Sequence, residues 1–473
     1  MKRFIFLAAF LFNACFTIFS QPYPMFVCRY GFTFEISMQK NWGYLQPVIL
    51  SVTPNSSAEA AGLRVNDIIE QINDKPTTGE TYDTIANWLQ NSNNQIHLTI
   101  SNLSKSHKSH TISKNCYLNN SITEKDLAGI YSFYSLEDVQ TQAFTCPFKT
   151  IVNPESNLIQ YASFGFVAPD PNNPDLAKSI NAAIRKSLEQ KGLKFSDKNP
   201  DLMIQTYYSL TANPNFRNNP QADKFPVAYR YNLKSKSMKK LPIYYNPLIH
   251  TNQAKFFLQF GIRITDNKNK NNTPVWECEA NELLQSNYSL NDYTEFHIPL
   301  MLMQYPYPKS KETADYYYSR SKYNYTGIHY NMNNLKEIAE VDPDSPAAIA
   351  GIQPGDVVEK INGIKFVNNT KTADNNYKQF IYKTLSLRDP NTQFTNAEGF
   401  TRCMYWDAMK YGLVHDEFRK SEYSTAFSYL FYFEPYINLT GTNMISFNII
   451  RDKKKDEIKL KPLIVSEEVF ENR

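Results

Sequence analysis

Two hydrophobic patterns recur along this chain. Short segments such as IIEQI at 68–72 alternate apolar and polar residues, which predicts half-buried β-strands. The segment NPDLAKSINAAIRKSLEQKGL at 173–193 instead places its leucines and isoleucines on one helical stripe. Asn173 fits the N-cap of this helix, Pro174 its first turn and Gly192 its C-terminal end, so a helix is predicted here.

The middle of the chain, residues 137–306, combines both patterns. Strands are predicted in LIQYASFGF, PDLMIQTYYS, FFLQFGIRITD and TPVWECEANE, and a second helix-like segment in DYTEFHIPLMLMQYP. The order of strand, helix and three strands predicts a sheet-plus-helix domain of α/β or α+β type. The stretch that follows is rich in Pro, Tyr and Ser, and we predict a linker at 307–322.

The strongest pattern is an internal repeat. VTPNSSAEAAGLRVNDIIEQIND at 52–74 aligns without gaps with VDPDSPAAIAGIQPGDVVEKING at 341–363, and ten of the 23 positions are identical. Two copies so far apart do not form a solenoid. They predict two copies of one domain with a different domain between them.

Each copy predicts a series of turns around one short helix and one strand. In the first copy, Gly62 is predicted to end an Ala-rich helix and Asn66 to occupy a tight turn, because both residue types accept positive φ. Asp67 is predicted to accept a hydrogen bond from that turn, and Asn73 to begin a hairpin turn. The second copy places similar residues at the matching positions, Gly351 among them.

The repeated string resembles the PDZ family, and in the second copy the match is nearly complete. A segment similar to the PDZ carboxylate-binding loop precedes each copy: RYGFTFEI at 29–36 and YTGIHY at 325–330. TYDTIANWLQ at 81–90 fits the helix that forms the other wall of a PDZ peptide groove. The resemblance implies two PDZ-like units, 26–118 and 323–466, each a partly open β-barrel or sandwich with two helices.

The second unit departs from the family pattern. An insertion at about 384–436 separates its groove helix from the closing hairpin MISFNIIRDKKKDEIKLKP. The insertion is aromatic and mildly helical, and it could cover the groove, extend it or contact the central domain.

The central segment resembles an uncharacterised family of bacterial envelope lipoproteins, a domain-of-unknown-function family. The matching pieces are SINAAIRKSLEQKGL, NPDLMIQ, GIRITD and PVWECEA. This resemblance implies a fold and a location but no activity, and Trp276 is expected in the core. The expected fold class is therefore multidomain α+β.

The N-terminus predicts export. Lys2 and Arg3 precede an apolar run from Phe4 to Phe19, which makes residues 1–20 a signal peptide by this pattern. The alternative is a lipoprotein anchored at Cys15. No later stretch is apolar over about 18 residues, so the mature chain is expected to be soluble or peripheral to a membrane, in the periplasm, the outer envelope or outside.

Composition excludes several classes of function. Apolar residues make up 42% and charged residues 20% of the 473, which argues against general disorder. The net charge of +4 is dispersed along the chain, so no nucleic-acid partner is expected. The cysteines after the signal show no CxxC spacing, so no metal site is expected, and no small-molecule cofactor is expected either. Pairing of Cys28 with Cys116 after export stays open beside the simpler hypothesis of buried thiols.

An enzyme is not expected. The chain has no GxSxG or GNSGG segment, its seven histidines never fit HExxH, and it has no phosphate-binding or dinucleotide motif. Carboxylates paired by folding would leave no such pattern, so an accessory or degenerate PDZ-type protease stays as an alternative.

The PDZ resemblance also implies the binding residues. Backbone N–H groups of Tyr30, Gly31 and Phe32 would hold the terminal carboxylate of a peptide that adds as a strand beside FTFEI, and Arg29 would add a favourable field. The predicted groove residues are Phe34, Tyr82 and Leu89. The matching loop of the second copy is Thr326, Gly327 and Ile328.

These observations favour a non-enzymatic scaffold or adaptor of the cell envelope that binds protein or peptide C-termini. Other envelope proteins are the expected partners. In the alternative, the PDZ-like units are purely structural parts of an envelope assembly. An insertion lying in the second groove would favour that alternative.

Overall fold

The computed structural model describes most of the chain from Tyr30 onward. The described ranges are 30–54, 56–103, 107–114, 121–131, 139–168, 172–217, 228–233, 237–241, 243–244, 254–268, 273–284, 286–309, 312–393, 404–420, 423, 426–430 and 444–472. The predicted signal peptide, the alternative anchor Cys15 and the site residue Arg29 lie outside these residues, as do Cys28 and Cys116. Within them, no helix is both long and apolar enough to cross a membrane.

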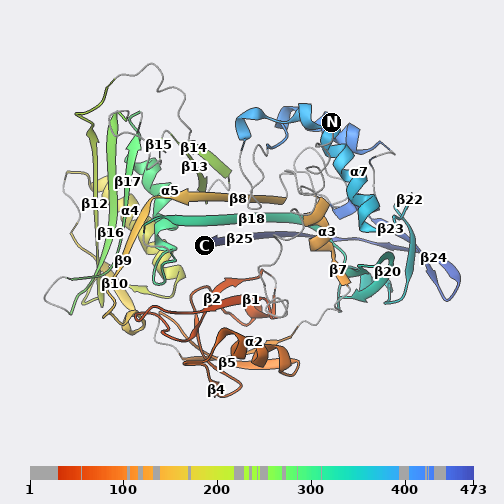
Figure 1. Cartoon of the computed structure of the whole chain (residues 1–473), viewed down its shortest axis with the longest axis horizontal. Helices are drawn as coiled ribbons and strands as arrows, with labels where there is room; N and C mark the ends of the chain where they lie inside the picture. Colours follow the sequence, from red (N-terminus) through yellow and green to blue (C-terminus); the bar gives the residue numbers. More distant parts are fainter. Residues whose placement is uncertain are drawn as a thin grey trace, which may run out of the picture.

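The described residues form a mixed α+β protein made mostly of sheets, none of which closes into a barrel. Figure 1 shows the two PDZ-like units and the central domain as three regions of the molecule. Trp42, Val48 and Ile68 of the first unit belong to the same buried apolar cluster as the central domain. A set of long strands runs from the central domain on one side to the second unit on the other.

The first unit is one antiparallel sheet with the order β1-β2-β3-β5-β6, in which β4 pairs with β3. Its strands are β1 (Phe32–Ile36), β2 (Pro47–Val52), β3 (Ile68–Ile72), β4 (Lys75–Pro76), β5 (Gln95–Ser101) and β6 (Lys108–Ser113). Its helices are α1 (Ser57–Ala60) and α2 (Tyr82–Asn91). Among the described residues, β1 pairs with β2 alone, so it is an edge strand.

The turns predicted from the repeat are confirmed. Gly62 has a φ of 85° and Asn66 a φ of 73°, the left-handed conformations that these residue types accept. Asp67 Oδ2 accepts a hydrogen bond from Arg64 N at 2.9 Å, which closes the turn before β3. The second copy repeats this geometry, with a φ of 88° at Gly351.

The central domain is built on a sheet with the order β11-β10-β12-β16-β17-β15, in which β9 pairs with β17. Its strands are β9 (Phe148–Val152), β10 (Ser163–Phe166), β11 (Lys194–Phe195), β12 (Leu202–Ala212), β15 (Ile243–Tyr244), β16 (Phe256–Asp266) and β17 (Pro274–Leu284), with a separate hairpin of β13 (Ala228–Asn232) and β14 (Ser237–Leu241). Helices α4 (Pro174–Gln190) and α5 (Leu290–Leu302) lie against each other and share the sheet's apolar core. Trp276 is fully buried there, as predicted.

A three-stranded antiparallel sheet joins the central domain to the second unit (Figure 1). It has the order β25-β18-β8 and consists of β8 (Val139–Cys146), β18 (Ala314–Tyr325) and β25 (Leu463–Asn472). The prediction of a linker at 307–322 is therefore wrong from Ala314 onward, because β18 is paired along both edges. Its buried Tyr316 and Tyr318 supply part of the apolar contact.

The second unit has the sheet order β24-β23-β21-β20-β19-β7, in which β22 pairs with β21. Its strands are β7 (Ser121–Thr123), β19 (Ile328–Asn331), β20 (Asn334–Val341), β21 (Val357–Ile361), β22 (Ile364–Lys365), β23 (Ile445–Arg451) and β24 (Lys454–Leu460). Its helices are α3 (Glu124–Tyr131), α6 (Pro346–Ala350), α7 (Thr370–Lys383) and α8 (Tyr411–Phe418). Strands β19 to β24 match β1 to β6 in order, and β7 is an additional strand at the edge beside β19.

The described part of the predicted insertion packs on the second unit. Besides α8, it contains the 3-10 turns η5 (Leu385–Leu387), η6 (Pro390–Thr392), η7 (Ala408–Lys410) and η8 (Ala426–Leu430). Phe418 contacts Phe380 of α7, and Phe427 contacts Phe366, each pair with ring centroids 4.9 Å apart. The insertion therefore enlarges the core of this unit on the side of α7.

Candidate functional site

The predicted carboxylate-binding loop of the first unit is held against the start of α1. Gly31 has a φ of 84°, and a Cβ at this position would come within 2.1 Å of Ser56 Cβ. The Gly31 carbonyl accepts a hydrogen bond from Thr53 N at 2.7 Å, and the Tyr30 carbonyl accepts one from Ala58 N at 3.1 Å. The loop therefore requires glycine, because both its backbone conformation and its close approach to Ser56 exclude a side chain.

The predicted groove residues lie together between β1 and α2. Phe32, Phe34 and Leu89 are at most 4% exposed and belong to the core of the unit. Tyr82, at the start of α2, stacks on Phe34 with ring centroids 4.9 Å apart and an interplanar angle of 25°. Tyr30 Oη donates to the Leu89 carbonyl at 3.2 Å. Of the predicted groove residues, Tyr82 alone is half-buried rather than buried.

The loop of the second unit repeats this construction. Gly327 has a φ of 87°, and a Cβ there would come within 2.2 Å of Ser345 Cβ. The Gly327 carbonyl accepts from Asp342 N at 2.8 Å, and the Thr326 carbonyl accepts from Ala347 N at 2.9 Å. The two loops are thus built alike, as the repeat predicts.

The second loop is occupied by Glu124, which lies 202 residues earlier in the chain than Thr326. Glu124 Oε2 accepts hydrogen bonds from Thr326 N at 2.7 Å and from Gly327 N at 3.1 Å. Oε1 accepts from the Thr326 hydroxyl and, at 3.1 Å, from the Tyr429 hydroxyl of η8. Burial raises the pKa of Glu124 to about 7, although these hydrogen bonds act to lower it.

A strand precedes this carboxylate. β7 runs antiparallel to β19 and pairs Thr123 with His329 and Ile122 with Tyr330. In the first unit, the corresponding edge of β1 carries no strand among the described residues. The two units therefore differ at the place where a PDZ domain receives a peptide.

Sequence reasoning missed Glu124. The only signal in SITEKD is a capping pattern, in which Asp126 N donates to Thr123 Oγ1 at 3.1 Å and Thr123 Oγ1 donates to Asp126 Oδ2 at 2.7 Å. Such a pattern marks the start of a helix and gives no indication of the loop that a side chain will reach.

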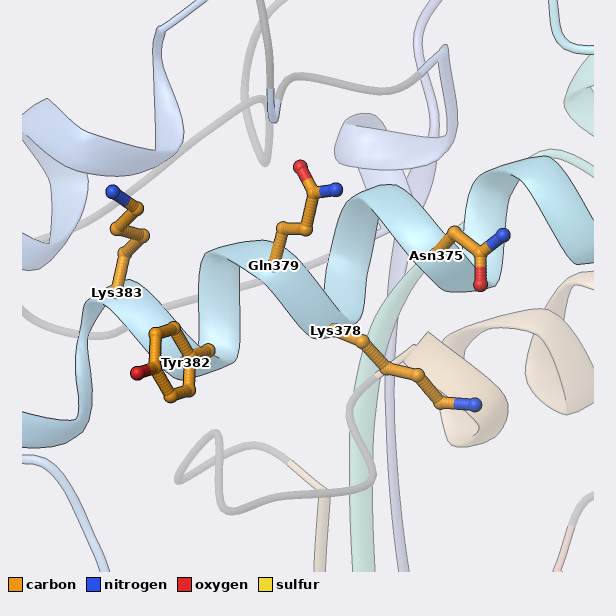
Figure 2. A pocket seen from close by; sticks show the side chains of 5 residues that line it. All are labelled: Asn375, Lys378, Gln379, Tyr382 and Lys383. Atoms are coloured by element: carbon orange, nitrogen blue, oxygen red, sulfur yellow. The ribbon is translucent and has the colours of Figure 1, made fainter.

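A surface concavity lies on the exposed side of α7. Its lining residues are Asn375, Lys378, Gln379, Tyr382 and Lys383. Figure 2 shows that their side chains leave one helix in diverging directions. They offer no converging set of polar groups, so this concavity is not a candidate ligand site.

A buried charged cluster lies in the central domain. Glu282 pairs with Arg230 at 3.3 Å and accepts a hydrogen bond from the Tyr293 hydroxyl at 2.9 Å. His297 lies 3.5 Å from Glu282, and burial lowers the pKa of His297 to about 3. All four side chains are at most 3% exposed, so this cluster is part of the core and is closed to a substrate. No group of three or more metal-ligating side chains occurs in the part of the chain that the structure describes.

Comparison with known families agrees with the two-unit architecture. The PDZ domain family model matches residues 48–101 and 337–381, and the model for a domain of unknown function, DUF4136, matches residues 149–307. The chain therefore has two PDZ domains that flank a DUF4136 domain. PDZ domains indicate a protein-interaction module, and neither of the two matching family models is that of an enzyme.

A solved structure extends this likeness over the whole chain. The crystal structure of a PDZ domain protein from Parabacteroides distasonis is 44% identical in sequence, with a TM-score of 0.84. The alignment covers 94% of this chain and 99% of that protein. The chain belongs to the same family as this PDZ domain protein.

Other solved structures match only in part. The PelC dodecamer from Paraburkholderia phytofirmans is 12% identical, and the alignment covers 33% of this chain and 95% of that chain, with a TM-score of 0.18. A photosystem II D1 C-terminal processing protease is also 12% identical and has a TM-score of 0.17, with 35% of this chain and 38% of that chain covered. Scores this low carry no argument about function. No curated protein sequence is significantly similar to this chain.

Proposed function

We propose that this chain is an exported, non-enzymatic cell-envelope protein whose first PDZ domain binds the C-termini of other proteins, so that it acts as a scaffold or adaptor. The observation that carries the proposal is the position of β1. This strand lies at the sheet edge among the described residues, follows the loop at Gly31 and faces α2. A C-terminal peptide adds to such an edge by main-chain hydrogen bonds, and its carboxylate meets the loop amides.

The structure of the second domain supports the proposal that the first domain binds a carboxylate. Like the first loop, its loop has a glycine with positive φ, Gly327, that packs closely against a serine. The amides of Thr326 and Gly327 both donate to one carboxylate oxygen. Because the first loop has the same construction, its amides are expected to donate hydrogen bonds to a carboxylate in the same way. In the first domain, the carboxylate would come from a partner.

Export and the envelope location rest on the N-terminal sequence. Lys2, Arg3 and the apolar run to Phe19 have the order of a secretory signal, and Cys15 offers the alternative of a lipid anchor. Partners would accordingly be other envelope proteins with accessible C-termini.

The first test compares peptides with and without a terminal carboxylate. A pool of fluorescent hexapeptides with varied last residues is titrated against the full chain, as free acids and as C-terminal amides. Free acids are expected to bind at least about tenfold more tightly, since the loop amides form charge-assisted hydrogen bonds only with a carboxylate. Equal binding of the two forms, or no binding of either, would refute the proposal.

A second test assigns the groove. Gly31→Val should abolish binding, but its Cβ would meet Ser56, so loss of binding would not separate the site from the fold. Tyr82→Phe removes only a hydroxyl, which is predicted to contact the third residue from the peptide's end. A preference for Ser, Thr, Asp or Glu at that position should fall about five- to tenfold. The matched control is Tyr382→Phe on the exposed side of α7.

The alternative, a structural role for the PDZ units, has two observations in its favour. Glu124 and β7 already fill the second loop and its edge strand. Tyr429 of the insertion bonds to Glu124 and to Tyr330 of β19. Both observations favour a structural role for the second domain only. If free-acid peptides fail to bind the full chain, the structural hypothesis extends to both domains.

The protease alternative predicts that the purified chain hydrolyses a protein substrate. Hydrolysis of casein by the purified chain, abolished by a class-specific inhibitor, would support that alternative. No hydrolysis is expected. His107 Nδ1 lies 3.2 Å from the Ser101 hydroxyl, but the same nitrogen also faces Glu70, and the Ser101 hydroxyl donates to Glu70. These three groups therefore do not form the relay of a serine nucleophile, a histidine base and an acid that a serine protease needs.

A further inference from the structure

The second PDZ domain makes two sets of ligand-like contacts with its own chain. Its loop amides donate to the Glu124 carboxylate, and β7, directly before Glu124, pairs with the edge strand β19. A bound C-terminal peptide makes the same two kinds of contact. We propose that residues 121–124 are an internal ligand of the second PDZ domain, that the Glu124 side chain replaces a peptide's terminal carboxylate, and that the domain is thereby closed to external C-termini.

The direction of β7 fits this role. Ser121 pairs with Asn331 and Thr123 with His329, so the chain runs antiparallel to β19 and arrives at the loop with its C-terminal end. A C-terminal peptide must have this same polarity for its carboxylate to reach the loop. Ile122 is only 7% exposed and joins the core of the domain, where an apolar ligand side chain would lie.

The chain leaves the loop immediately after Glu124. Asp126 and Thr123 bond to each other and start helix α3, which directs the backbone away from β19. No main-chain carboxylate exists at this point in the chain, so a side chain must supply the negative charge that the loop amides favour. Glu124, the first residue of α3, does so.

The helix and the insertion complete the closure. Tyr131, at the end of α3, stacks on Phe427 with ring centroids 5.6 Å apart and meets Tyr377 of α7 edge-on at 6.1 Å. The Tyr429 hydroxyl lies 2.5 Å from that of Tyr330 on β19 and also donates to Glu124. Figure 1 shows α3 and β7 at the end of the long strands, beside the second domain. An external peptide would have to displace a strand, a helix and a buried carboxylate together.

The internal ligand also determines on which domain residues 121–131 pack. Residues 121–131 lie between the first PDZ domain and the central domain in sequence, yet they bind the second domain. Lys125, next to Glu124, pairs with Glu467 of β25. The internal ligand thus ties the middle of the chain to the long three-stranded sheet. This inference does not depend on peptide binding by the first domain.

Acetate tests the carboxylate site directly. In the full chain, Glu124→Ala removes the carboxylate and leaves the Thr326 and Gly327 amides without their acceptor. We expect a lower thermal midpoint than in the wild type, and a saturable rise of that midpoint with sodium acetate. Hydrogen exchange at these two amides should slow again in parallel.

The controls separate carboxylate binding from a general salt effect. Acetamide and sodium chloride at the same concentrations should not restore Glu124→Ala. Glu337→Ala, which removes a half-buried carboxylate of β20 in the same domain, should not respond to acetate. If acetate acts no better than chloride, or stabilises the wild type equally, the internal-ligand proposal is overturned.

Glu124→Gln serves as a second variant with nearly unchanged shape. At pH 5, exchange at Thr326 and Gly327 should be about tenfold faster than in the wild type. Each of the two carboxyl oxygens of Glu124 accepts two hydrogen bonds, whereas a glutamine side chain has a single oxygen. Unchanged exchange would overturn the proposal. Closure is tested in the wild type with the free-acid peptide pool: exchange over residues 121–131 should stay the same, and release of this segment by a peptide would show that the domain is open.

Discussion

The buried carboxylate of Glu124 predicts a specific dependence of local stability on pH. In the unfolded chain this group has its ordinary pKa of 4.5, and in the folded chain burial raises the pKa to about 7. Between these values the folded chain binds one proton more than the unfolded chain. The stability contributed at this site is therefore fully present below pH 4.5 and falls as the pH rises toward 7.

The size of the effect follows from the two pKa values. A carboxyl whose pKa rises from 4.5 to about 7 on folding lowers the free energy of unfolding by about 3 kcal/mol once it is fully ionised. Glu124 is 2% exposed, so solvent screening does not reduce this figure. Glu124→Gln cannot ionise. The free energy of unfolding of the wild type, relative to that of Glu124→Gln, should therefore be about 3 kcal/mol lower at pH 8 than at pH 4.5.

The assay is hydrogen exchange of β19 amides in the full chain, measured from pH 4.5 to 8 and corrected for intrinsic exchange. The opening free energy of the wild type should fall with pH relative to Glu124→Gln. The nearby pairs His329–Asp342 and Lys125–Glu467 are present in both proteins, so their contributions cancel. Parallel curves would refute the reasoning, and a wild type that gains stability with pH would show that the four hydrogen bonds outweigh burial.

Two further substitutions, each with a matched control, test the site. Gly327→Ala should destabilise the full chain by several kcal/mol and Gly351→Ala by about 1 kcal/mol, because both positions have positive φ but only at Gly327 would a Cβ meet Ser345 at 2.2 Å. Equal shifts of the thermal midpoint would contradict this. Tyr429→Phe should cost about 1–3 kcal/mol, since buried Glu124 loses a donor, while Tyr382→Phe, at 73% exposed, should stay within about 0.5 kcal/mol by urea unfolding.

The two PDZ domains could be predicted from sequence because their signature is local. Gly62, Asn66 and Asp67 shape one turn within a few residues, and their types follow from φ and from hydrogen bonding to adjacent backbone. The helix at 173–193 was predictable for the same reason, since its stripe and its end residues are contiguous. Patterns of this kind need no knowledge of distant partners.

The features missed depend on contacts between distant parts of the chain. Strand β18 carries Ser, Arg and Lys between its tyrosines and follows a Pro-rich stretch, so its sequence resembles a linker. It becomes a strand because β8 and β25, from far apart in the sequence, pair along both of its edges. Glu124 likewise gains its role only when the Thr326 loop folds against it. Neither the strands that pair with β18 nor the loop that binds Glu124 can be predicted from the local sequence pattern.

The central claim is that the first PDZ domain receives an external C-terminus while the second holds its own. Hydrogen exchange of the full chain with a saturating free-acid peptide tests both halves in one measurement. We predict slower exchange over residues 30–36, no change over 121–131 and 325–331, and no effect of the amidated peptide. Unchanged exchange at 30–36 together with release of 121–131 would contradict the account.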